Sequence, residues 1–335
     1  MSVIAVVGSV NMDLVIRAPR QPLLGETLMG HSFGTTGGGK GSNQALACAR
    51  LGAESHMVGC VGNDDFGSRL RATLLEGKVD CEYLEVSKSA GTGVALITVT
   101  DEGDNTIVLA SGANATLDAK SIVCAADLFK KADAVLFQLE IPFSAVETGL
   151  ELARKTGCKT VLTPAPARAL PLSVWKMIDY LVLNETELAF YASNNSAGDT
   201  DSKGRVKGDV LDDARYLLNL GTKGVVVTRG AHGGVVVTKD KSFPYSPFKV
   251  DAVDSTGAGD SFCAAMIVGL SEGMPLEQAV RFASAAGALA CTRFGAHPSL
   301  PWRYEVEALL EKGGDIPEAY SALIKEHTGK NELNP

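Results

Sequence analysis

Short apolar runs alternate with helical patterns along most of this sequence, and this alternation constrains the fold more than any other feature. Runs such as VVGSV, AVLFQL and GVVVT are almost continuously apolar, which is typical of strands that are buried on both faces. Strands separated by helices predict βαβ units and a parallel sheet, and therefore an α/β fold. We expect strands at 3–8, 56–61, 134–139, 159–162, 180–183 and 224–228, and helices at 42–51, 66–76, 144–155, from 185 onward and at 210–220.

One part of the sequence breaks the alternation. Residues 92–100 and 105–109 have strand character and only the turn-like sequence DEGD lies between them, so they predict a β-hairpin. Residues 13–36 also lack helical periodicity and contain two prolines and Gly25, which favours extended chain with turns. Together the two segments could form a small second sheet that acts as a lid. Alternatively, the hairpin could be an antiparallel edge of the main sheet.

Charge and composition exclude several classes of protein. The 31 Lys and Arg against 39 Asp and Glu give a net charge of −8, which argues against nucleic acid as the partner. No run of 18 uncharged apolar residues occurs, and no basic segment precedes an apolar one at the start, so we expect a cytoplasmic protein that crosses no membrane. The seven cysteines are scattered without a C-x-x-C pair, which predicts reduced thiols that serve as small core residues.

Two familiar kinds of catalytic centre are also not expected. The five histidines are far apart and have no zinc-ligand spacing, so a zinc site is not predicted. The sequence contains no G-x-S-x-G, the motif of the nucleophile elbow in serine hydrolases. The chemistry is therefore sought in the glycine clusters.

The first glycine cluster is GTTGGGKGSN at residues 34–43. It has Gly41 where a P-loop needs Ser or Thr for Mg²⁺, and it does not match G-x-G-x-x-G. A dehydrogenase that binds a dinucleotide is therefore unsupported. What remains is backbone without side chains that leads into a helix near Ser42, where Lys40 and Asn43 could grip a hydroxylated ligand. The alternative is a flexible hinge.

The second glycine cluster is DSTGAGDSF at residues 254–262. The apolar run that follows predicts a buried helix, so the glycines lie at its N-terminus. There the N–H groups of Gly257, Ala258 and Gly259 would bind a phosphate oxygen or stabilise developing negative charge. Asp260 beside this anion hole could accept a proton from an attacking hydroxyl. The alternative is that Asp260 only caps the helix.

Other polar residues are expected at the carboxyl edge of the sheet, where open α/β sheets bind ligands. Asn184 and Glu187 open a helix after a strand. They could orient water around Mg²⁺ and nucleotide phosphates, or form only a capping box. Thr228 and Gly230 follow another strand and predict either a nucleotide-binding loop or an ordinary turn.

The N-terminal strand is followed by a further amide and carboxylate pair. Asn11 and Asp13 are one residue apart at the expected end of this strand and would lie on the same side of an extended chain. Such a pair suits sugar hydroxyls, although an Asx-turn is the alternative. Glu140 is another carboxylate at a strand end on the same edge.

With these motifs in this order, the chain resembles the ribokinase-like family of carbohydrate and nucleoside kinases over about residues 3–312. The resemblance lies in Asn11, Asp13, GGGKGSN, Glu140, NETE and DSTGAGD, together with PAPAR at 164–168. It implies a three-layer α/β/α sandwich with a mainly parallel central sheet and a small β-sheet lid. It also implies transfer of the γ-phosphoryl group of ATP to the 5-hydroxyl of D-ribose. Lid strands in this family commonly pair between subunits, which implies a homodimer.

The resemblance further implies a role for each matching residue. Asp260 would be the general base, beside an anion hole formed by the N–H groups of Gly257, Ala258 and Gly259. The sugar would contact Asn11, Asp13, Gly39, Lys40, Asn43, Glu140 and Asp260. The residues that would bind nucleotide and Mg²⁺ are Asn184, Glu187, Thr228, Arg229, Gly230, Ala231, His232, Gly233, Gly259 and Ser284. Ser284 stands at a position near the adenine where members of the family often have His or Asn. A monovalent cation, K⁺, would be held by Asp254, Thr256, Ala290, Arg293, Gly295 and Ser299.

The expected organisation is one kinase domain at residues 1–312, with a lid from about 13–36 and 92–112. A polar surface insertion is predicted at 194–208, and a C-terminal extension with a helical stretch at 317–326 is predicted at 313–335. Other functions fit the same motifs. One is a kinase for 2-deoxyribose, fructose or a nucleoside such as adenosine, and another is a sugar-binding module without catalysis. Asp260 beside the anion loop favours a kinase.

Overall fold

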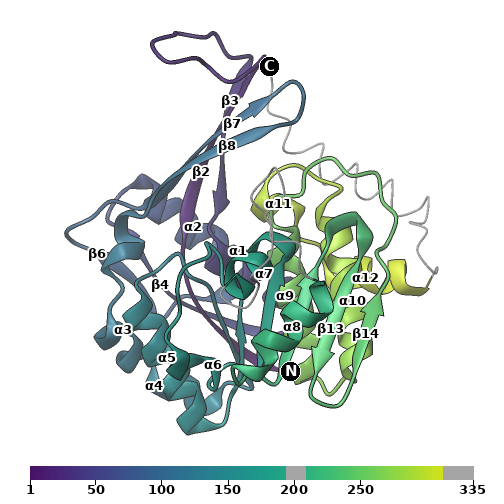
Figure 1. Cartoon of the computed structure of the whole chain (residues 1–335). Helices are drawn as coiled ribbons and strands as arrows, with labels where there is room; N and C mark the ends of the chain where they lie inside the picture. Colours follow the sequence, from purple (N-terminus) through teal and green to yellow (C-terminus); the bar gives the residue numbers. More distant parts are fainter. Residues whose placement is uncertain (194–208, 312–335) are drawn as a thin grey trace.

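The computed structural model describes residues 1–193 and 209–311. The predicted insertion at 194–208 and the predicted extension at 313–335, with its helical stretch at 317–326, lie outside the described residues. Figure 1 shows a large sheet surrounded by helices and a small sheet that projects away from it. The predicted α/β fold is therefore confirmed.

The large sheet is mainly parallel. Its strand order is β14-β13-β12-β11-β10-β9-β1-β4-β5, with β6 paired to β4, and only β13 and β14 run antiparallel to their neighbours. The strands are β1 (Val3–Val7), β4 (Glu54–Gly62), β5 (Val79–Asp80), β6 (Leu84–Ser87), β9 (Ala134–Phe137), β10 (Lys159–Leu162), β11 (Tyr180–Asn184), β12 (Gly224–Thr228), β13 (Gly234–Thr238) and β14 (Ser242–Tyr245). Since β1 has β4 on one side and β9 on the other, the strand order reverses at β1. Ligands of open α/β sheets bind at the carboxyl ends beside such a reversal.

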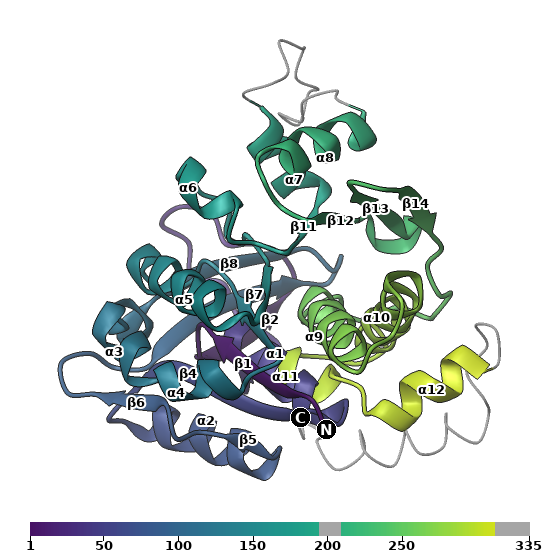
Figure 2. The same ribbon diagram turned by 90° about the horizontal axis from the view of Figure 1, so that it is seen from below.

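Helices cover both faces of this sheet (Figure 2). Because side chains alternate along a strand, Ile4 and Val6 of β1 enter one core and Ala5 and Val7 enter the other. The first core includes α1 (Lys40–Arg50), α2 (Asp65–Glu76), α9 (Ala258–Ser271), α10 (Leu276–Ala290) and α12 (Arg303–Glu311). The second includes α3 (Ala119–Cys124), α4 (Ala126–Lys131), α5 (Phe143–Thr156), α6 (Leu172–Trp175), α7 (Glu185–Ala192) and α8 (Val210–Asn219).

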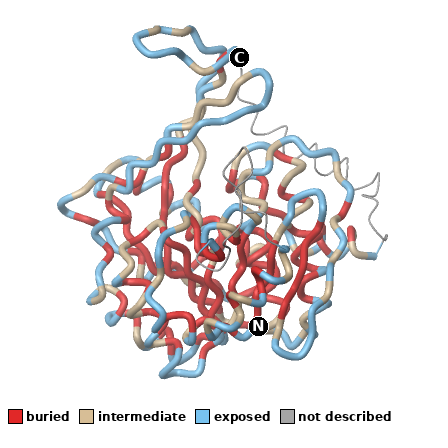
Figure 3. Tube along the Cα trace, viewed as in Figure 1, coloured by how far each residue is buried: buried red, intermediate tan, exposed pale blue. Residues whose placement is uncertain are grey.

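The small sheet has the order β3-β2-β7-β8 and is separate from the large one. Its strands are β2 (Asn11–Ala18), β3 (Ser32–Gly38), β7 (Gly93–Thr100) and β8 (Asn105–Ala110). The hairpin β7–β8 is antiparallel as predicted, and β2 pairs in parallel with β7. The prediction of a second sheet is thus confirmed, and the alternative of an edge on the main sheet is wrong. Figure 3 shows that this sheet is far more exposed than the large one.

Two details differ from the sequence-based expectations. Asn11 and Asp13 do not lie at the end of the first strand, because β1 stops at Val7 and both residues belong to β2 of the small sheet. Among the cysteines, Cys124 is exposed and Cys291 is only partly buried, whereas the other five are core residues; all seven are free thiols. None of the helices in the described residues is long and apolar enough to cross a membrane.

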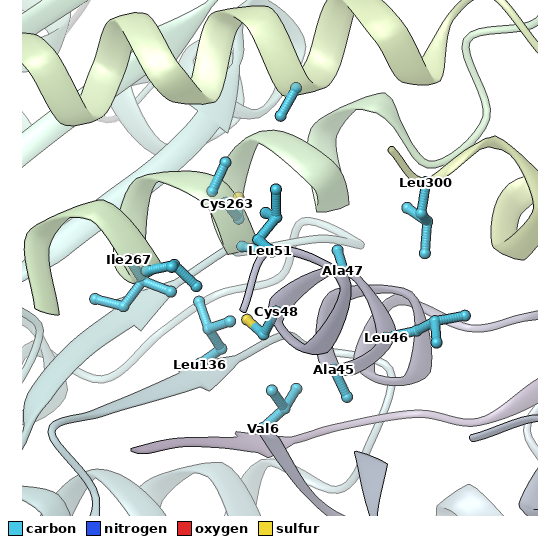
Figure 4. Packing of buried hydrophobic residues seen from close by; sticks show 14 of the residues in the cluster. Val6, Ala45, Leu46, Ala47, Cys48, Leu51, Leu136, Cys263, Ile267 and Leu300 are labelled. Carbon is cyan, nitrogen blue, oxygen red and sulfur yellow. The ribbon is translucent and has the colours of Figure 1, made fainter. Parts of the chain in front are cut away.

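Helix α1 lies at the centre of the molecule and determines how the site is assembled. Its residues from Gly41 to Cys48 are all buried. Small side chains let it approach its neighbours closely, and Figure 4 shows Cys48 between Val6 and Leu136 of the sheet and Cys263 of α9. Gly41 meets the chain that leaves β1, and a Cβ atom here would lie 2.6 Å from the Gly8 carbonyl carbon and the Ser9 nitrogen.

This contact predicts that Gly41→Ala destabilises the protein. Alanine favours a helix over glycine by about 1 kcal/mol, but the added methyl group would overlap main-chain atoms that cannot move independently. We expect the free energy of unfolding, measured by urea denaturation, to fall by about 1–3 kcal/mol. The matched control is Gly259→Ala in α9, where a Cβ atom meets no heavy atom within 4 Å and no loss of stability is expected. Equal stability of Gly41→Ala and the wild type would contradict the packing described for α1.

Candidate active site

The candidate site lies at the carboxyl ends of β1 and β9, between the first turns of α1 and α9. Asp260 in the first turn of α9 is 8% exposed. Its Oδ2 accepts a hydrogen bond from Asn43 Nδ2 at 2.8 Å and its Oδ1 accepts one from Gln44 Nε2 at 3.0 Å. The N-cap of α9 is Gly257, and no side chain caps this helix. The alternative in which Asp260 is a helix cap is therefore wrong.

The turn before Asp260 leaves the N-terminus of α9 without a side-chain cap. Gly257 has φ of 78°, a left-handed conformation that favours glycine. A Cβ atom on Gly259 would meet no heavy atom within 4 Å, so open space lies beside it. The first N–H groups of a helix have no acceptor within the helix, although the Ala258 N–H donates to Ser255 O at 3.2 Å. The geometry at Gly257 and Gly259 suits an anion, as the glycine cluster predicts.

Three carboxylates, two buried and one partly buried, lie near one lysine. Lys40 is the first residue of α1, and its Nζ lies 3.6 Å from Glu140 Oε1, just after β9. Glu140 Oε2 also accepts a 2.5 Å hydrogen bond from Ser9 Oγ. Asp13 and Asp260 are the other two carboxylates, each within electrostatic reach of Lys40 and Glu140. Carboxylates that accept and an ammonium group that donates are suited to the hydroxyl groups of a polyol.

Burial controls the protonation of these groups. The pKa of Asp13 is raised to about 7, mainly by burial and further by the charges of Glu140 and Asp260, while the charge of Lys40 lowers it. Burial also raises the pKa of Asp260, against the opposing effects of Lys40 and the hydrogen bonds from Asn43 and Gln44. For Lys40, burial lowers the pKa, but the nearby carboxylates outweigh it and hold the pKa above its ordinary value. The site therefore combines a protonated lysine with two aspartates whose pKa is raised above its ordinary value.

Close main-chain contacts complete this part of the site. Gly39 is the N-cap of α1 with φ of 90°, and a Cβ atom there would lie 2.7 Å from the Asn11 nitrogen. The Asn11 side chain is almost fully buried and its Oδ1 accepts a hydrogen bond from Asn114 Nδ2 at 2.7 Å. The structure thus brings together the residues predicted for the sugar: Asn11, Asp13, Gly39, Lys40, Asn43, Glu140 and Asp260.

Asn184 and Glu187 lie where β11 meets α7. The Asn184 Oδ1 accepts from the Glu187 N–H at 2.8 Å, and Glu187 Oε2 accepts from the Asn184 N–H at 2.9 Å. The capping box that the sequence left as an alternative does form. Burial raises the pKa of Glu187, while the charge of Lys40 lowers it and that of Asp260 raises it. The Glu187 carboxylate is therefore close to the same charged groups, Lys40 and Asp260, as the residues predicted to bind the sugar. Its oxygens fit a hard cation such as Mg²⁺.

The predicted nucleotide loop follows β12. Thr228 ends this strand directly opposite Asn184, and Arg229 Nε lies 2.9 Å from Glu185 Oε1. Gly230, Ala231 and His232 form an exposed 3₁₀ turn that ends at Gly233. A Cβ atom on Gly233 would lie 2.1 Å from Tyr245 O. Ser284 on α10 donates to Ser246 O at 3.2 Å, so the segment around Tyr245 joins this residue to the loop.

The residues predicted to hold a monovalent cation come from two regions that the structure ties together, the loop before α9 and the stretch from the end of α10 to α11 (Ala296–Ser299). Asp254 accepts from Thr256 N–H at 2.9 Å through Oδ1 and from Gly295 N–H at 2.9 Å through Oδ2. Ser299 Oγ donates to Thr256 O at 3.3 Å. The Arg293 side chain is buried in an ion pair with Glu305. It can therefore contribute only a main-chain oxygen, as can Ala290 at the end of α10.

Several site residues were not predicted from the sequence. Ser9 binds Glu140, Asn114 orients Asn11, and Gln44 binds Asp260. Gln138 in turn donates to Gln44. These residues lie in apolar runs or outside the glycine clusters, and their partners are distant in sequence. No local motif could have identified them.

Comparison with known proteins agrees with this geometry. A model of the pfkB family of carbohydrate kinases matches residues 1–303. The ribokinase of Haemophilus influenzae is 37% identical over 308 residues, which cover 92% of this chain and 98% of that protein. A solved ribokinase from Thermotoga maritima has a TM-score of 0.83 at 36% identity and covers 93% of this chain and 100% of that chain. The ribokinase of Arabidopsis thaliana, solved with ribose and ATP, has a TM-score of 0.82 at 31% identity and covers 93% and 99%.

This chain belongs to the pfkB family of carbohydrate kinases. The family resemblance inferred from its motifs is therefore confirmed. So is the predicted fold, a mainly parallel sheet between layers of helices with a small second sheet.

The raised pKa of Asp13 makes a prediction about stability. The unfolded chain holds this carboxyl near its ordinary value of 3.8, whereas the folded chain holds it at about 7. Since the folded state binds the proton more tightly, this group reduces stability as pH rises from about 4 to about 7. In the absence of substrates, Asp13→Asn should therefore unfold at higher urea concentration than the wild type at pH 8, a gain of about 2–4 kcal/mol. The gain should shrink toward zero near pH 4.

The matched control is Asp240→Asn, which changes an exposed carboxylate before β14 and should leave stability unchanged at both pH values. The same Asp13→Asn protein should bind the sugar poorly. A variant no more stable than the wild type at pH 8 would show that burial of Asp13 has no free-energy cost.

Proposed function

We propose that this protein is an ATP-dependent ribokinase, which transfers the γ-phosphoryl group of ATP to the 5-hydroxyl of D-ribose to give D-ribose 5-phosphate and ADP. The observation on which this depends is a buried carboxylate, Asp260, next to the uncapped N-terminus of α9 and facing a cluster of polar groups predicted to bind the sugar. Relatives of similar length are ribokinases, and one was solved with ribose and ATP. Both facts support ribose as the acceptor.

In this proposal Asp260 removes the proton of the attacking hydroxyl as its oxygen bonds to the γ-phosphorus and the bond to the leaving oxygen of ADP breaks. A general base works best with a pKa near the working pH, and burial raises that of Asp260 in this direction. The N–H groups of Gly257 and Gly259 would stabilise the charge on the transferred group, since positioning and electrostatics dominate phosphoryl transfer. Lys40 and Glu140 would hold the sugar so that one hydroxyl faces Asp260.

Two cations complete the proposed site. Mg²⁺ would neutralise charge on the phosphates, and Asn184 and Glu187 would hold this ion on the protein side. The phosphates belong to a nucleotide that would lie along the Thr228–Gly233 loop, with Ser284 beside it. A monovalent cation, K⁺ in the proposal, would be bound by the two loops that Asp254 and Ser299 tie together. The segment with Asp254 and Thr256 leads directly into the start of α9, so its order would affect the anion hole.

The first test measures ADP formation from ATP and Mg²⁺ with D-ribose, 2-deoxyribose, fructose and adenosine. We expect D-ribose to give the highest kcat/KM, because buried polar groups left without their hydroxyl partner reject an analogue. Asp260→Asn should lower kcat about 10²–10⁴-fold with little change in ribose affinity. Near-normal turnover of that variant would remove Asp260 as the base. Ribose binding without any ADP formation would instead indicate a sugar-binding module.

The cation proposal predicts faster turnover in KCl than in tetramethylammonium chloride at equal ionic strength. A cation that fits the Asp254 and Ser299 loops should order the start of α9, while a large organic cation cannot enter. The measurement is the initial rate of ribose phosphorylation, with NaCl as an intermediate comparison. Identical rates in all three salts would argue against a monovalent cation site.

We further propose a homodimer formed through the small sheet. All six residues of β8 are exposed at the sheet edge, and Ile107 and Val108 are 55% and 66% exposed. A long apolar edge of this kind is a site for pairing with another strand. Sedimentation velocity should find a dimer for the wild type and a monomer for Val108→Lys. The control Leu172→Lys, an exposed leucine on α6, should remain dimeric, and a monomeric wild type would exclude this arrangement.

The proposed partners are therefore D-ribose, ATP and a second copy of the chain, with neither nucleic acid nor membrane. The proposed location is the cytoplasm. Seven unpaired thiols, five of them buried, support this location, because thiols remain reduced in that compartment.

A further inference from the structure

We propose that Gln44 and Gln138 form a directional pair of amides that holds the Asp260 carboxylate in the orientation needed to accept a proton. This inference rests on the proposed function, since it assigns positioning residues to the same reaction. Neither glutamine belongs to the glycine or strand-end motifs identified in the sequence. Both side chains are fully buried.

The three side chains form a continuous chain of hydrogen bonds. Gln44, in the first half of α1, donates from Nε2 to Asp260 Oδ1 at 3.0 Å. Its Oε1 accepts from Nε2 of Gln138 at 2.6 Å. Gln138 directly follows β9, so the chain connects the sheet, α1 and α9 across the floor of the site.

The direction of this chain is determined by the carboxylate. An ionised carboxylate can only accept hydrogen bonds, so Gln44 must turn its amino group toward Asp260 and its oxygen away. That oxygen needs a donor because it is buried, and Gln138 supplies one. The amino group of Gln44 also lies 3.4 Å from Thr163 Oγ1, a hydroxyl oxygen that can accept a hydrogen bond from it.

Gln138, at the far end of this chain of hydrogen bonds, shows that the pair of buried amides costs stability. Gln138 Oε1 is buried and has no hydrogen-bond partner among the described residues. An unpaired buried acceptor is unfavourable, and an apolar side chain of similar shape would avoid it. The fold also makes room for this amide, because a Cβ atom on Gly8 would lie only 1.8 Å from Gln138 Oε1. The Gln138 amide therefore reduces stability and also requires glycine at position 8. Both costs point to a functional role for this side chain.

Together with Asn43, the amide pair holds the carboxylate at two points. Asn43 Nδ2 binds Oδ2 and Gln44 Nε2 binds Oδ1, so rotation of the carboxyl group is blocked. Each oxygen still has a second lone pair, and one of these remains for the hydroxyl proton. The result is a base whose proton-accepting direction is defined before the sugar binds.

The amide pair also affects the pH at which Asp260 becomes ionised. Burial raises the pKa of Asp260, and Lys40 and the hydrogen bonds of Asn43 and Gln44 lower it. The other titratable groups that face Asp260 are Glu140, Asp13, Glu187 and the thiol of Cys263. Loss of the Gln44 donor leaves these groups in place and removes one interaction that favours the charged form. The base would then become protonated at a higher pH.

The test compares Gln44→Met, Gln138→Met and the double variant in ribose phosphorylation across pH. Methionine keeps the shape and removes the amide. Gln44→Met should lower kcat about 10–100-fold, since a misplaced base loses most of its contribution, with the KM for ribose within about threefold of the wild type. Its acidic limb of log kcat against pH should move to higher pH. Gln138→Met should lose less, about 3–10-fold, and the double variant should resemble Gln44→Met because the two amides act as one unit.

The control is Ser55→Ala, which removes another buried hydrogen bond to α1, from Ser55 Oγ to Ala45 O at 2.8 Å. It should reduce thermal stability without moving the acidic limb. An unmoved limb in Gln44→Met, or losses that multiply in the double variant, would overturn the proposal. So would a loss of stability alone.

A second measurement does not depend on activity. The ¹³C NMR signal of the Asp260 carboxyl, assigned by its absence in Asp260→Asn, should titrate at a higher pH in Gln44→Met than in the wild type. If the wild type forms no ADP with ribose but this shift is observed, the proposed function fails and the amide pair stands. If ribose is phosphorylated and the signal titrates at the same pH in both proteins, only the amide pair fails.

Discussion

The close packing of α1 against α9 is the constraint on which the rest of the site depends. Small residues in both helices allow this approach, while Gly41 lets the start of α1 lie against the chain that leaves β1. The approach of the two helices brings Asn43 and Gln44 within hydrogen-bond distance of Asp260, a residue more than 200 positions away in the chain. The same approach places Lys40 near Glu140 beside the reversal of strand order at β1.

This arrangement concentrates charge where burial makes charge unfavourable. Asp13, Glu140 and Asp260 share one partly buried lysine, and burial raises the pKa of both aspartates. Removing carboxylates from water costs free energy unless they are paired, and a single lysine cannot pair with all three. The large apolar cores on both faces of the sheet offset this cost. The hydroxyl groups of a sugar are donors that suit these carboxylates.

The main architecture could be predicted from the sequence because it depends on local patterns. Apolar runs buried on both faces identified the parallel strands, and glycines before apolar helices identified the start of α9 and the region where α1 begins. The predicted position of Asn11 and Asp13 at the end of the first strand was wrong, because residues 3–17 have strand character almost throughout. The break after β1 is created by tertiary contacts, including the hydrogen bond from Ser42 N–H to Ser9 O at 2.9 Å. Likewise, Gln44, Gln138 and Asn114 have no local signal, because their roles depend on partners from other elements.

The central claim is that Asp260 meets the attacking hydroxyl beside the start of α9, and a crystal structure with ribose and a non-hydrolysable ATP analogue tests it most directly. The account predicts the 5-hydroxyl oxygen at about 3 Å from an Asp260 oxygen, with the γ-phosphate against the turn at Gly257 and Gly259. A carboxylate turned away from the sugar, or a γ-phosphate bound elsewhere, would contradict it.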